Sequence, residues 1–341
     1  MRAKPGPFMK KRNLAIAFVG AAGAAVAVKM LTRAATVNFD DVADNIIHAE
    51  RSRFINVDGI RVHYQEFGDA ANPPMILIHG YTASVYVWKT AAPLLAKAGF
   101  RVIAVDLVGF GYTDKPRWFE YSITAQTRLI ERFMDRLGIG RAIVVGSSYG
   151  GAVAATLTLD YPERVEKLVL VDAVINDDLQ SHPILKLASI PGVGEVITPF
   201  LSDSKTFMRY RMNGTFARAN RHMVTEERID SIRRPLHAAD GHHSLLATSR
   251  NWNANRIEHD AHLINHPTLV IWGEDDAVIP ASDGHKLHDA ILHARLVVLK
   301  NCGHVPHEEC SKLFCEIVSE FCHDKKSKLS KRDADFAKIE A

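Results

Sequence analysis

The chain has 341 residues, of which 47% are apolar and 24% are charged, and its formal net charge at pH 7 is only +3. The apolar content is ordinary for a globular protein with a buried core, and the length allows one large domain or two. So small a net charge gives no reason to expect a nucleic-acid partner.

The first 33 residues are predicted to be a signal peptide or a membrane anchor. Five basic residues within the first twelve precede an uncharged run, Asn13 to Val28, that is rich in alanine and glycine. Basic residues followed by an apolar run have the layout of an export signal or signal anchor. A run of roughly 16 residues is short for a membrane span, which needs about 20, so cleavage and retention both stay open. We expect the rest of the chain to be exported or membrane-anchored, on the periplasmic face in a bacterium, rather than cytoplasmic.

Residues 34–52 are expected to form a linker or a lead-in helix, and the fold begins after them. Arg53–Val57 and Ile60–Glu66 alternate apolar and polar residues around Asp58-Gly59, which predicts a β-hairpin with a tight turn. The following run, Met75–Ile78, is continuously apolar, as expected for a strand that is covered on both faces of a parallel sheet.

Strands and helices are then predicted to alternate. Helices are expected at residues 86–98 and 124–137. Further apolar strands are expected at 101–105, 142–145, 168–171, 268–272 and 295–299. This alternation predicts an α/β fold with a mostly parallel, doubly wound sheet, built from residues 53–174 and 263–323.

No strand pattern occurs between residues 175 and 262, where four prolines (183, 191, 199 and 235) are expected to divide the chain into short helices. Because ligands of such sheets bind at the carboxyl ends of the strands, this insertion is predicted to be a helical cap over the crevice. Its apolar stretch from Ile184 to Leu201 is expected either to roof the crevice or only to pack the cap onto the sheet. Residues 324–341 are rich in charge and are expected to be a disordered tail.

The sequence Gly146-Ser147-Ser148-Tyr149-Gly150 joins a β-branched apolar run to a run of small residues. A chain that passes from strand to helix within one or two residues strains the residue at the apex, and glycines on either side avoid a Cβ clash. The hydroxyl of Ser148 would then project beside the N–H groups of a helix N-terminus, which favour an oxyanion. We predict that Ser148 is a nucleophile; Ser147, outside the Gly-x-Ser-x-Gly register, is the weaker candidate.

Three further segments follow predicted strands. A turn after Ile78-His79-Gly80 would direct the backbone N–H of Tyr81 towards the crevice, where it could form an oxyanion hole with the N–H of Tyr149. Glu274-Asp275-Asp276 follows one later strand, and Asn301-Cys302-Gly303-His304 follows another.

A serine hydroxyl needs a neutral imidazole to accept its proton, and a carboxylate must orient that imidazole. We assign these catalytic roles to His304 and Asp276. The rival carboxylates Asp275 and Asp172 can instead cap turns.

Neither a metal nor a cofactor is expected. The four cysteines are Cys302, Cys310, Cys315 and Cys322. They include no Cys-x-x-Cys pair, and we expect them to be mostly reduced and buried. Five histidines in the region of the predicted cap show no known ligand spacing; they are His237, His242, His243, His262 and His266.

From about Phe54 to Cys322 the chain resembles the α/β-hydrolase superfamily. The motifs that carry the resemblance are His79-Gly80, Asp106 to Pro116, Gly146 to Gly151, Trp272 to Asp276, and Gly303-His304. The order Ser, Asp, His is that of the family, whose acid stands three residues after the glycine of the Trp-Gly motif, here Asp276. A serine at position 148 disfavours the family's dehalogenases and epoxide hydrolases, which use an aspartate nucleophile.

The closest resemblance is to bacterial esterases and lipases and to the carbon–carbon hydrolases of aromatic-ring degradation. The latter often carry tryptophan directly after the catalytic histidine, where this chain has Val305, which favours esters. We therefore expect a serine hydrolase that cleaves small carboxylic esters through an acyl-enzyme. The alternatives are hydrolysis of a carbon–carbon bond in a meta-cleavage-type diketone, or a ligand receptor that turns over slowly or not at all. The sequence makes no prediction of acyl length or oligomeric state.

Overall fold

The computed structural model describes residues 37–178, 183–324 and 337–340. The predicted signal or anchor segment, residues 1–33, lies outside the described residues. Within the described ranges, no helix has both the length and the apolar character that a membrane crossing requires.

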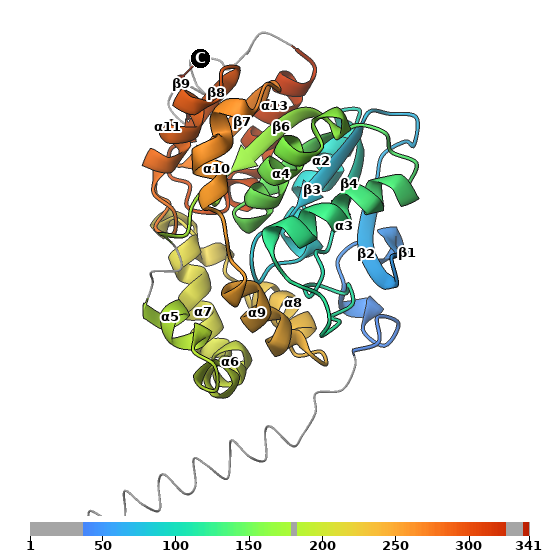
Figure 1. Ribbon diagram of the computed structural model, residues 1–341, viewed down its shortest axis with the longest axis vertical. Coiled ribbons are helices and arrows are strands. Elements are labelled where there is room, and N and C mark those ends of the chain that lie inside the picture. Colours follow the sequence, from blue (N-terminus) through green and yellow to red (C-terminus); the bar gives the residue numbers. More distant parts are fainter. Residues whose placement is uncertain (1–36, 179–182, 325–336, 341) are drawn as a thin grey trace, which may run out of the picture. The chain divides into compact units, whose positions relative to one another are not determined.

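A nine-stranded sheet organises the described chain (Figure 1), in the spatial order β1-β2-β4-β3-β5-β6-β7-β8-β9. The strands are β1 (Ser52–Val57), β2 (Ile60–Phe67), β3 (Pro74–Ile78), β4 (Arg101–Val105), β5 (Ala142–Ser147), β6 (Val165–Val171), β7 (Thr268–Gly273), β8 (Ala294–Leu299) and β9 (Ala337–Glu340). The six strands from β4 to β8 in this order are parallel, whereas β1, β2 and β9 pair antiparallel. The predicted α/β fold is confirmed.

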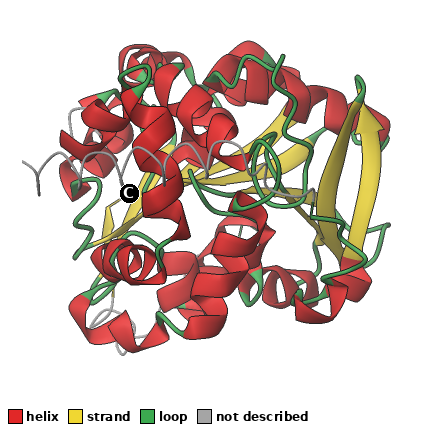
Figure 2. Cartoon of the chain, turned by 90° about the horizontal axis from the view of Figure 1, so that it is seen from below, coloured by secondary structure: helices red, strands yellow, loops and turns green. Residues whose placement is uncertain are grey.

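Helices cover both faces of the sheet (Figure 2). Outside the insertion they are α2 (Ala91–Lys97), α3 (Ile123–Arg136), α4 (Tyr149–Asp160), α11 (Ala281–Ala290), α12 (Pro306–Glu309) and α13 (Ser311–Cys322). Because both faces are covered, every residue of β5 and β7 is buried. Such burial stabilises the fold by about 1.5–3 kcal/mol for each fully buried Val, Leu or Ile side chain.

The N-terminal hairpin forms at the predicted place. Asp58 and Gly59 adopt positive φ angles of 50° and 86°, which matches the twist of two-residue hairpin turns. Ahead of β1, residues 37–51 contain only two single-turn 3₁₀ helices, Ala43–Asn45 and Ala49–Arg51, rather than a longer lead-in helix.

A helical insertion lies between β6 and β7, and all of its helices except the last lie together at one end of the sheet (Figure 1). They are α5 (Pro183–Ser189), α6 (Val193–Asp203), α7 (Lys205–Thr215), α8 (Glu226–Leu236), α9 (Gly241–Arg250) and α10 (Asn255–Asp260). The expectation that all four prolines separate helices is wrong for two of them, because Pro199 lies inside α6 and Pro235 inside α8. Pro235 is the penultimate residue of α8, where the loss of one backbone donor does not interrupt a longer helix.

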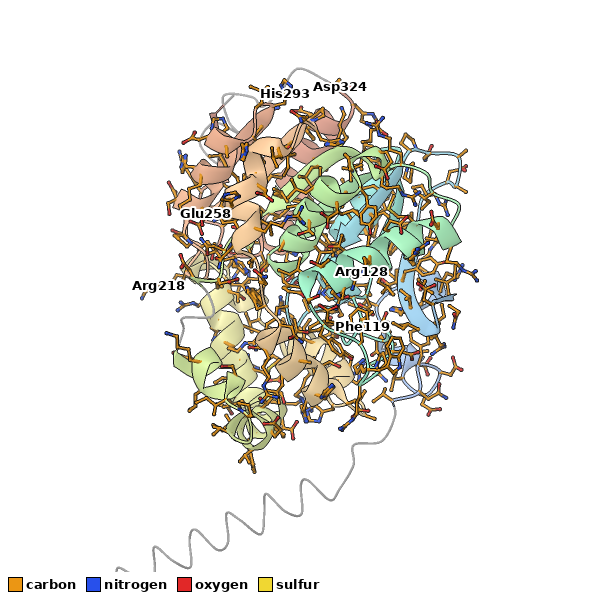
Figure 3. All side chains as sticks on the ribbon, in the orientation of Figure 1. Phe119, Arg128, Arg218, Glu258, His293 and Asp324 are labelled. Atoms are coloured by element: carbon orange, nitrogen blue, oxygen red, sulfur yellow. A yellow bond between two sulfur atoms is a disulfide. The ribbon has the colours of Figure 1, made fainter. Side chains whose placement is uncertain are left out.

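The C-terminal part of the insertion is hydrogen-bonded to the segment that follows β6, where the insertion begins. Glu258 of α10, labelled in Figure 3, accepts a hydrogen bond of 3.0 Å from Asn176 Nδ2, and its N–H donates to the carbonyl of Ile175 at 3.0 Å. Its carboxylate also pairs with Lys286 Nζ at 2.7 Å. The two connections between sheet and insertion are therefore held side by side.

The structure departs from the expectation of a disordered tail. Residues 337–340 form β9 antiparallel to β8. Without β9, the outer edge of β8 would leave its backbone N–H and C=O groups unpaired, and an exposed edge readily accepts another strand.

The expectation that the cysteines are mostly reduced is wrong for one pair. Cys302 and Cys310 form a disulfide with their Cα atoms 6.9 Å apart, because α12 turns the chain back towards the end of β8. Cys315 and Cys322 are free and buried, as expected, and burial raises the pKa of each thiol to about 12.

Candidate active site

Ser148 forms the sharp corner between β5 and α4. Its backbone has φ 54° and ψ −118°, a conformation that is strained for a residue with a side chain. The surrounding backbone holds it there. Its N–H donates to the carbonyl of Val171 at 2.9 Å, and its carbonyl accepts from the N–H groups of Gly151 and Val174 at 2.9 and 3.0 Å.

The glycines on either side of this corner are required by close backbone contacts. A Cβ on Gly146 would lie 2.2 Å from the carbonyl oxygen of Gly150, and a Cβ on Gly150 would lie 2.4 Å from that of Ile78. A larger residue at either position would push α4 away from the strands. The predicted geometric reason for the Gly-x-Ser-x-Gly pattern therefore holds.

His304 and Asp276 lie together at the ends of neighbouring strands. His304 Nδ1 is 2.8 Å from Asp276 Oδ2, and their side chains are only 8% and 0% exposed. The other carboxylate oxygen of Asp276 accepts backbone hydrogen bonds from Val278 and Ile279 at 2.7 and 3.1 Å. This arrangement places the proton of His304 on Nδ1 and leaves Nε2 to exchange a proton with a substrate or a nucleophile.

Asp172 lies behind this pair rather than in contact with the pocket. Its Oδ1 accepts a hydrogen bond from the N–H of Gly273 at 2.9 Å, and the side chain is fully buried. Ligand atoms of Asp172, Asp276 and His304 lie within 4.8 Å of one another. Burial, and then the nearby charge of Asp276, raise the pKa of Asp172 well above its usual range. A protonated Asp172 can donate to Asp276, so it is a neutral support of the carboxylate that holds His304.

The other rival, Asp275, is exposed, and its backbone N–H donates to the carbonyl of Cys302 at 2.9 Å. Of the histidines in the insertion, His237 and His242 contact Asp203 Oδ1 at 3.0 and 3.4 Å. None of these side chains lines the pocket described below.

The loop after β3 runs beside Ser148. A Cβ on Gly80 would lie 3.0 Å from Ser148 Cβ, so only glycine lets the loop pass this close without a shift. The loop is fixed by His79, whose Nε2 accepts from the N–H of Leu107 at 3.1 Å and whose Nδ1 therefore donates to the carbonyl of Gly80 at 2.8 Å. Burial lowers the pKa of His79, which favours the neutral form that this pattern needs.

The two N–H groups predicted to hold an oxyanion are available. Tyr149 is the first residue of α4, where backbone N–H groups have no partner within a helix. In the described chain, no acceptor is present for the backbone N–H of Tyr149 or of Tyr81. The phenol of Tyr81 donates to the carbonyl of Leu245 on α9 at 2.9 Å, which anchors this loop to the insertion.

A pocket joins these groups. Ser148, His304, Gly80 and Tyr81 line it, and its volume is about 80 Å³. Its apolar wall consists of Ala83, Val87, Met212, Ile232 and Val305. Of the two alternatives for the stretch from Ile184 to Leu201, a roof over the crevice has no support among the described residues, because α7 and α8 supply the part of the pocket lining that comes from the insertion. Leu187, Ile190 and Phe200 are exposed instead.

Three ionisable side chains of the pocket were not foreseen. Arg228 forms a buried ion pair with Glu308, with its Nη2 2.5 Å from Oε1 and its Nε 3.2 Å from Oε2. Arg211 donates to Thr82 Oγ1 at 2.6 Å and has no carboxylate partner among the described residues. His307 is the third. The sequence signal that could have indicated His307 is its position three residues after His304. No sequence signal could have indicated Arg211 or Arg228, because they lie in the helical insertion, which carries no motif.

The sequence model of one protein family, described as the alpha/beta hydrolase fold, matches residues 73–310. The chain belongs to the alpha/beta-hydrolase family.

Several members of this family are similar over most of their length. The 2-hydroxy-6-oxononadienedioate/2-hydroxy-6-oxononatrienedioate hydrolase of Burkholderia vietnamiensis is 30% identical over 303 residues, covering 82% of this chain and 99% of that protein. The 2-hydroxymuconate semialdehyde hydrolase of a Pseudomonas species is 31% identical over 283 residues, covering 80% and 94%. The solved structure of the meta-cleavage product hydrolase CumD from Pseudomonas fluorescens is 29% identical with a TM-score of 0.68, covering 81% and 98%.

Proposed function

We propose that this alpha/beta hydrolase cleaves a carbon–carbon bond in a ring-opened, meta-cleavage-type diketone acid, with Ser148 as nucleophile. His304 is the proton carrier and Asp276 the carboxylate that orients it. The observation that carries the choice of substrate is Arg211, a pocket cation with only a hydroxyl partner among the described residues. Arg228, in contrast, is neutralised by Glu308.

An arginine without an acidic partner is suited to a carboxylate, which it can bind through two parallel N–H donors. The names of the similar hydrolases support the same class, because they describe hydroxy-oxo acids or their ring-fission relatives. These names describe the similar proteins, and the assignment of the same substrate class to this chain is our proposal.

The proposed reaction uses the pocket as follows. Ser148 Oγ adds to the ketone carbon while His304 Nε2 takes its proton, and the N–H groups of Tyr81 and Tyr149 hold the oxyanion. The bond that breaks is in the diketone tautomer, in which the enol proton of the dienoate has moved to the carbon next to the ketone. When the serine adduct of this tautomer collapses, the bond from the ketone carbon to that neighbouring carbon breaks, and its electron pair passes into the conjugated carbonyl system. His304 then donates its proton to that carbon. A water molecule, deprotonated by His304, releases the acyl group from Ser148 as a carboxylic acid.

Ester hydrolysis is the second candidate, and Val305 is the observation that favours it. This residue follows His304 and lies on the apolar wall of the pocket, where it gives a conjugated substrate no polar contact. The same serine, histidine and aspartate would serve an ester, with the leaving alcohol taking the proton from His304.

One experiment separates these reactions. We would measure kcat/KM for 2-hydroxy-6-oxohepta-2,4-dienoate, followed by loss of its absorbance, and for p-nitrophenyl esters from acetate to octanoate. We expect the dienoate to be the better substrate by at least about tenfold, an advantage equivalent to one charge-assisted hydrogen bond. A reversed ranking would assign the protein to esters, and no turnover or burst with either class would indicate a receptor.

The variant Arg211→Met supplies the matched control. If Arg211 binds the substrate carboxylate, this change should lower kcat/KM about 10- to 100-fold for the dienoate and leave the neutral esters within about threefold of the unsubstituted protein. An equal loss for both substrates would mean that Arg211 only supports the loop through Thr82.

A further inference from the structure

His307 is a buried polar side chain for which the described chain offers no hydrogen-bond partner. It lies on α12, lines the pocket together with Ser148 and His304, and is 1% exposed. Within the described residues, neither Nδ1 nor Nε2 of its ring makes a hydrogen bond. Because a buried polar group without a partner is unfavourable, such groups are rare unless a ligand or water completes them.

Packing fixes the orientation of this ring. It lies against the indole of Trp88, with ring centroids 4.4 Å apart and planes at 35°, and it also contacts the ring of Phe314 at 6.1 Å and 62°. Both aromatic side chains are fully buried. The imidazole therefore cannot turn away from the pocket to find a partner elsewhere without disturbing the core.

The surroundings keep His307 neutral. Burial lowers the pKa of its imidazole to about 3, and the nearby His304 and Arg228 act in the same direction. The closest acid in sequence, Glu308, is already paired with Arg228. A neutral imidazole has one N–H donor and one acceptor nitrogen, so it suits an uncharged hydroxyl or carbonyl group rather than a carboxylate.

We propose that His307 is a specificity-determining residue that hydrogen-bonds a hydroxyl or carbonyl oxygen of the substrate inside the pocket. This inference rests on the proposed function, because it assumes that the substrate reacts at Ser148 in the same pocket. It divides recognition between two side chains: Arg211 takes a charged group and His307 an uncharged oxygen. His307 is not a second base, because His304 already has the orienting carboxylate of Asp276.

The test compares substrates that differ by one oxygen. The probes are p-nitrophenyl pentanoate, p-nitrophenyl 3-hydroxypentanoate and p-nitrophenyl 4-oxopentanoate. We expect the unsubstituted protein to prefer an oxygenated ester, and His307→Phe to reduce that preference by about 10- to 100-fold in kcat/KM. His307→Gln retains a donor and an acceptor and should restore most of the preference. An unchanged preference in His307→Phe, or no preference in the unsubstituted protein, would overturn the proposal.

Two further measurements separate this idea from its alternatives. A purely structural role of His307 predicts an equal loss for all three esters together with a lower Tm, and it predicts no rescue by His307→Gln. If no ester is cleaved, whether or not the proposed carbon–carbon hydrolysis of the dienoate is observed, calorimetry with 4-oxopentanoate and pentanoate still decides the role of His307. Tighter binding of 4-oxopentanoate that is lost in His307→Phe would support the role, and equal binding of the two acids would refute it.

Discussion

The backbone N–H of His304 donates a 2.7 Å hydrogen bond to the carbonyl of Thr215, the last residue of α7. The loop that carries the proposed proton carrier is therefore fastened to the helical insertion. Gly303 shows how closely they fit, since a Cβ there would lie 2.5 Å from the backbone nitrogen of Ala217. Any displacement of α7 is thus expected to move His304 as well.

Glu309 should be needed to hold this connection. Its carboxylate accepts from the N–H groups of Gly303 and Ala217 at 2.8 and 2.9 Å and from Asn220 Nδ2 at 2.8 Å. We expect Glu309→Ala to lower kcat at least about tenfold and the free energy of unfolding by about 3 kcal/mol, because three donors lose their acceptor. Enzyme kinetics and urea unfolding would measure both. The exposed Glu316 on α13 is the matched control, and a Glu316→Ala variant that loses as much would contradict this role.

Ser148→Ala should lower turnover by a factor on the order of 10⁴–10⁶, as the loss of a triad nucleophile does. Ser147→Ala should have a far smaller effect, because Ser147 is the last residue of β5 and precedes the strained corner. Steady-state kinetics on the same substrate would compare the two. An inactive Ser147→Ala protein beside an active Ser148→Ala protein would shift the nucleophile by one residue.

Asp276→Asn should reduce kcat by about 10⁴, because an amide in place of the carboxylate favours the wrong tautomer of His304. Asp172→Asn should cost much less, since Asp172 contacts the backbone of Gly273 and supports Asp276 from behind. Both variants must be folded by circular dichroism. The opposite ranking would transfer the catalytic carboxylate to the end of β6.

The buried proton of Asp172 should appear in the pH dependence of stability. Its pKa is raised in the folded protein, so the folded state binds more protons than the unfolded state once the pH exceeds the unfolded value of about 4. Stability from this group is therefore highest at low pH and declines as pH rises. Because Asp172→Asn cannot ionise, its free energy of unfolding relative to the unsubstituted protein should increase over the pH range above about 4. Urea unfolding across this range is the measurement, and a relative decrease would contradict a protonated Asp172.

The proposed export or anchoring segment can be tested by truncation. Removal of residues 1–33 should give a soluble protein with unchanged kcat/KM, because every proposed catalytic residue follows His79 in the sequence. Cell fractionation should place the full chain with membranes or the exported fraction and the truncated chain in the cytoplasm. Identical fractionation of the two, or an inactive truncated protein, would show that this segment has another role.

The parts of the molecule that sequence could predict are those determined by neighbouring residues. Continuous apolar runs placed β3 and β5 correctly, and the glycines around Ser148 indicated the corner between β5 and α4. The rule that parallel strands end at the same edge of the sheet placed Glu274-Asp275-Asp276 near His304, and the resemblance to the α/β-hydrolases selected Asp276 from these acids.

What sequence could not predict depends on packing between distant segments. The pocket wall from α7 and α8 follows from how the insertion folds back, whereas the more apolar stretch before it is partly exposed. The cation of Arg211 is available because its neighbour is Thr82 rather than an acid, and these residues are 129 positions apart. The pairing of β9 with β8 likewise joins segments that no local pattern connects.

The disulfide between Cys302 and Cys310 encloses His304 in a covalent ring. A cross-link over a separation of eight residues removes chain entropy from the unfolded state worth about 2.5 kcal/mol. The cross-link restricts the backbone of residues 303–309, which include His304 and its immediate neighbours. Since such bonds persist in oxidising compartments and are reduced in the cytosol, the place where the chain folds determines whether His304 sits in a closed ring or an open loop.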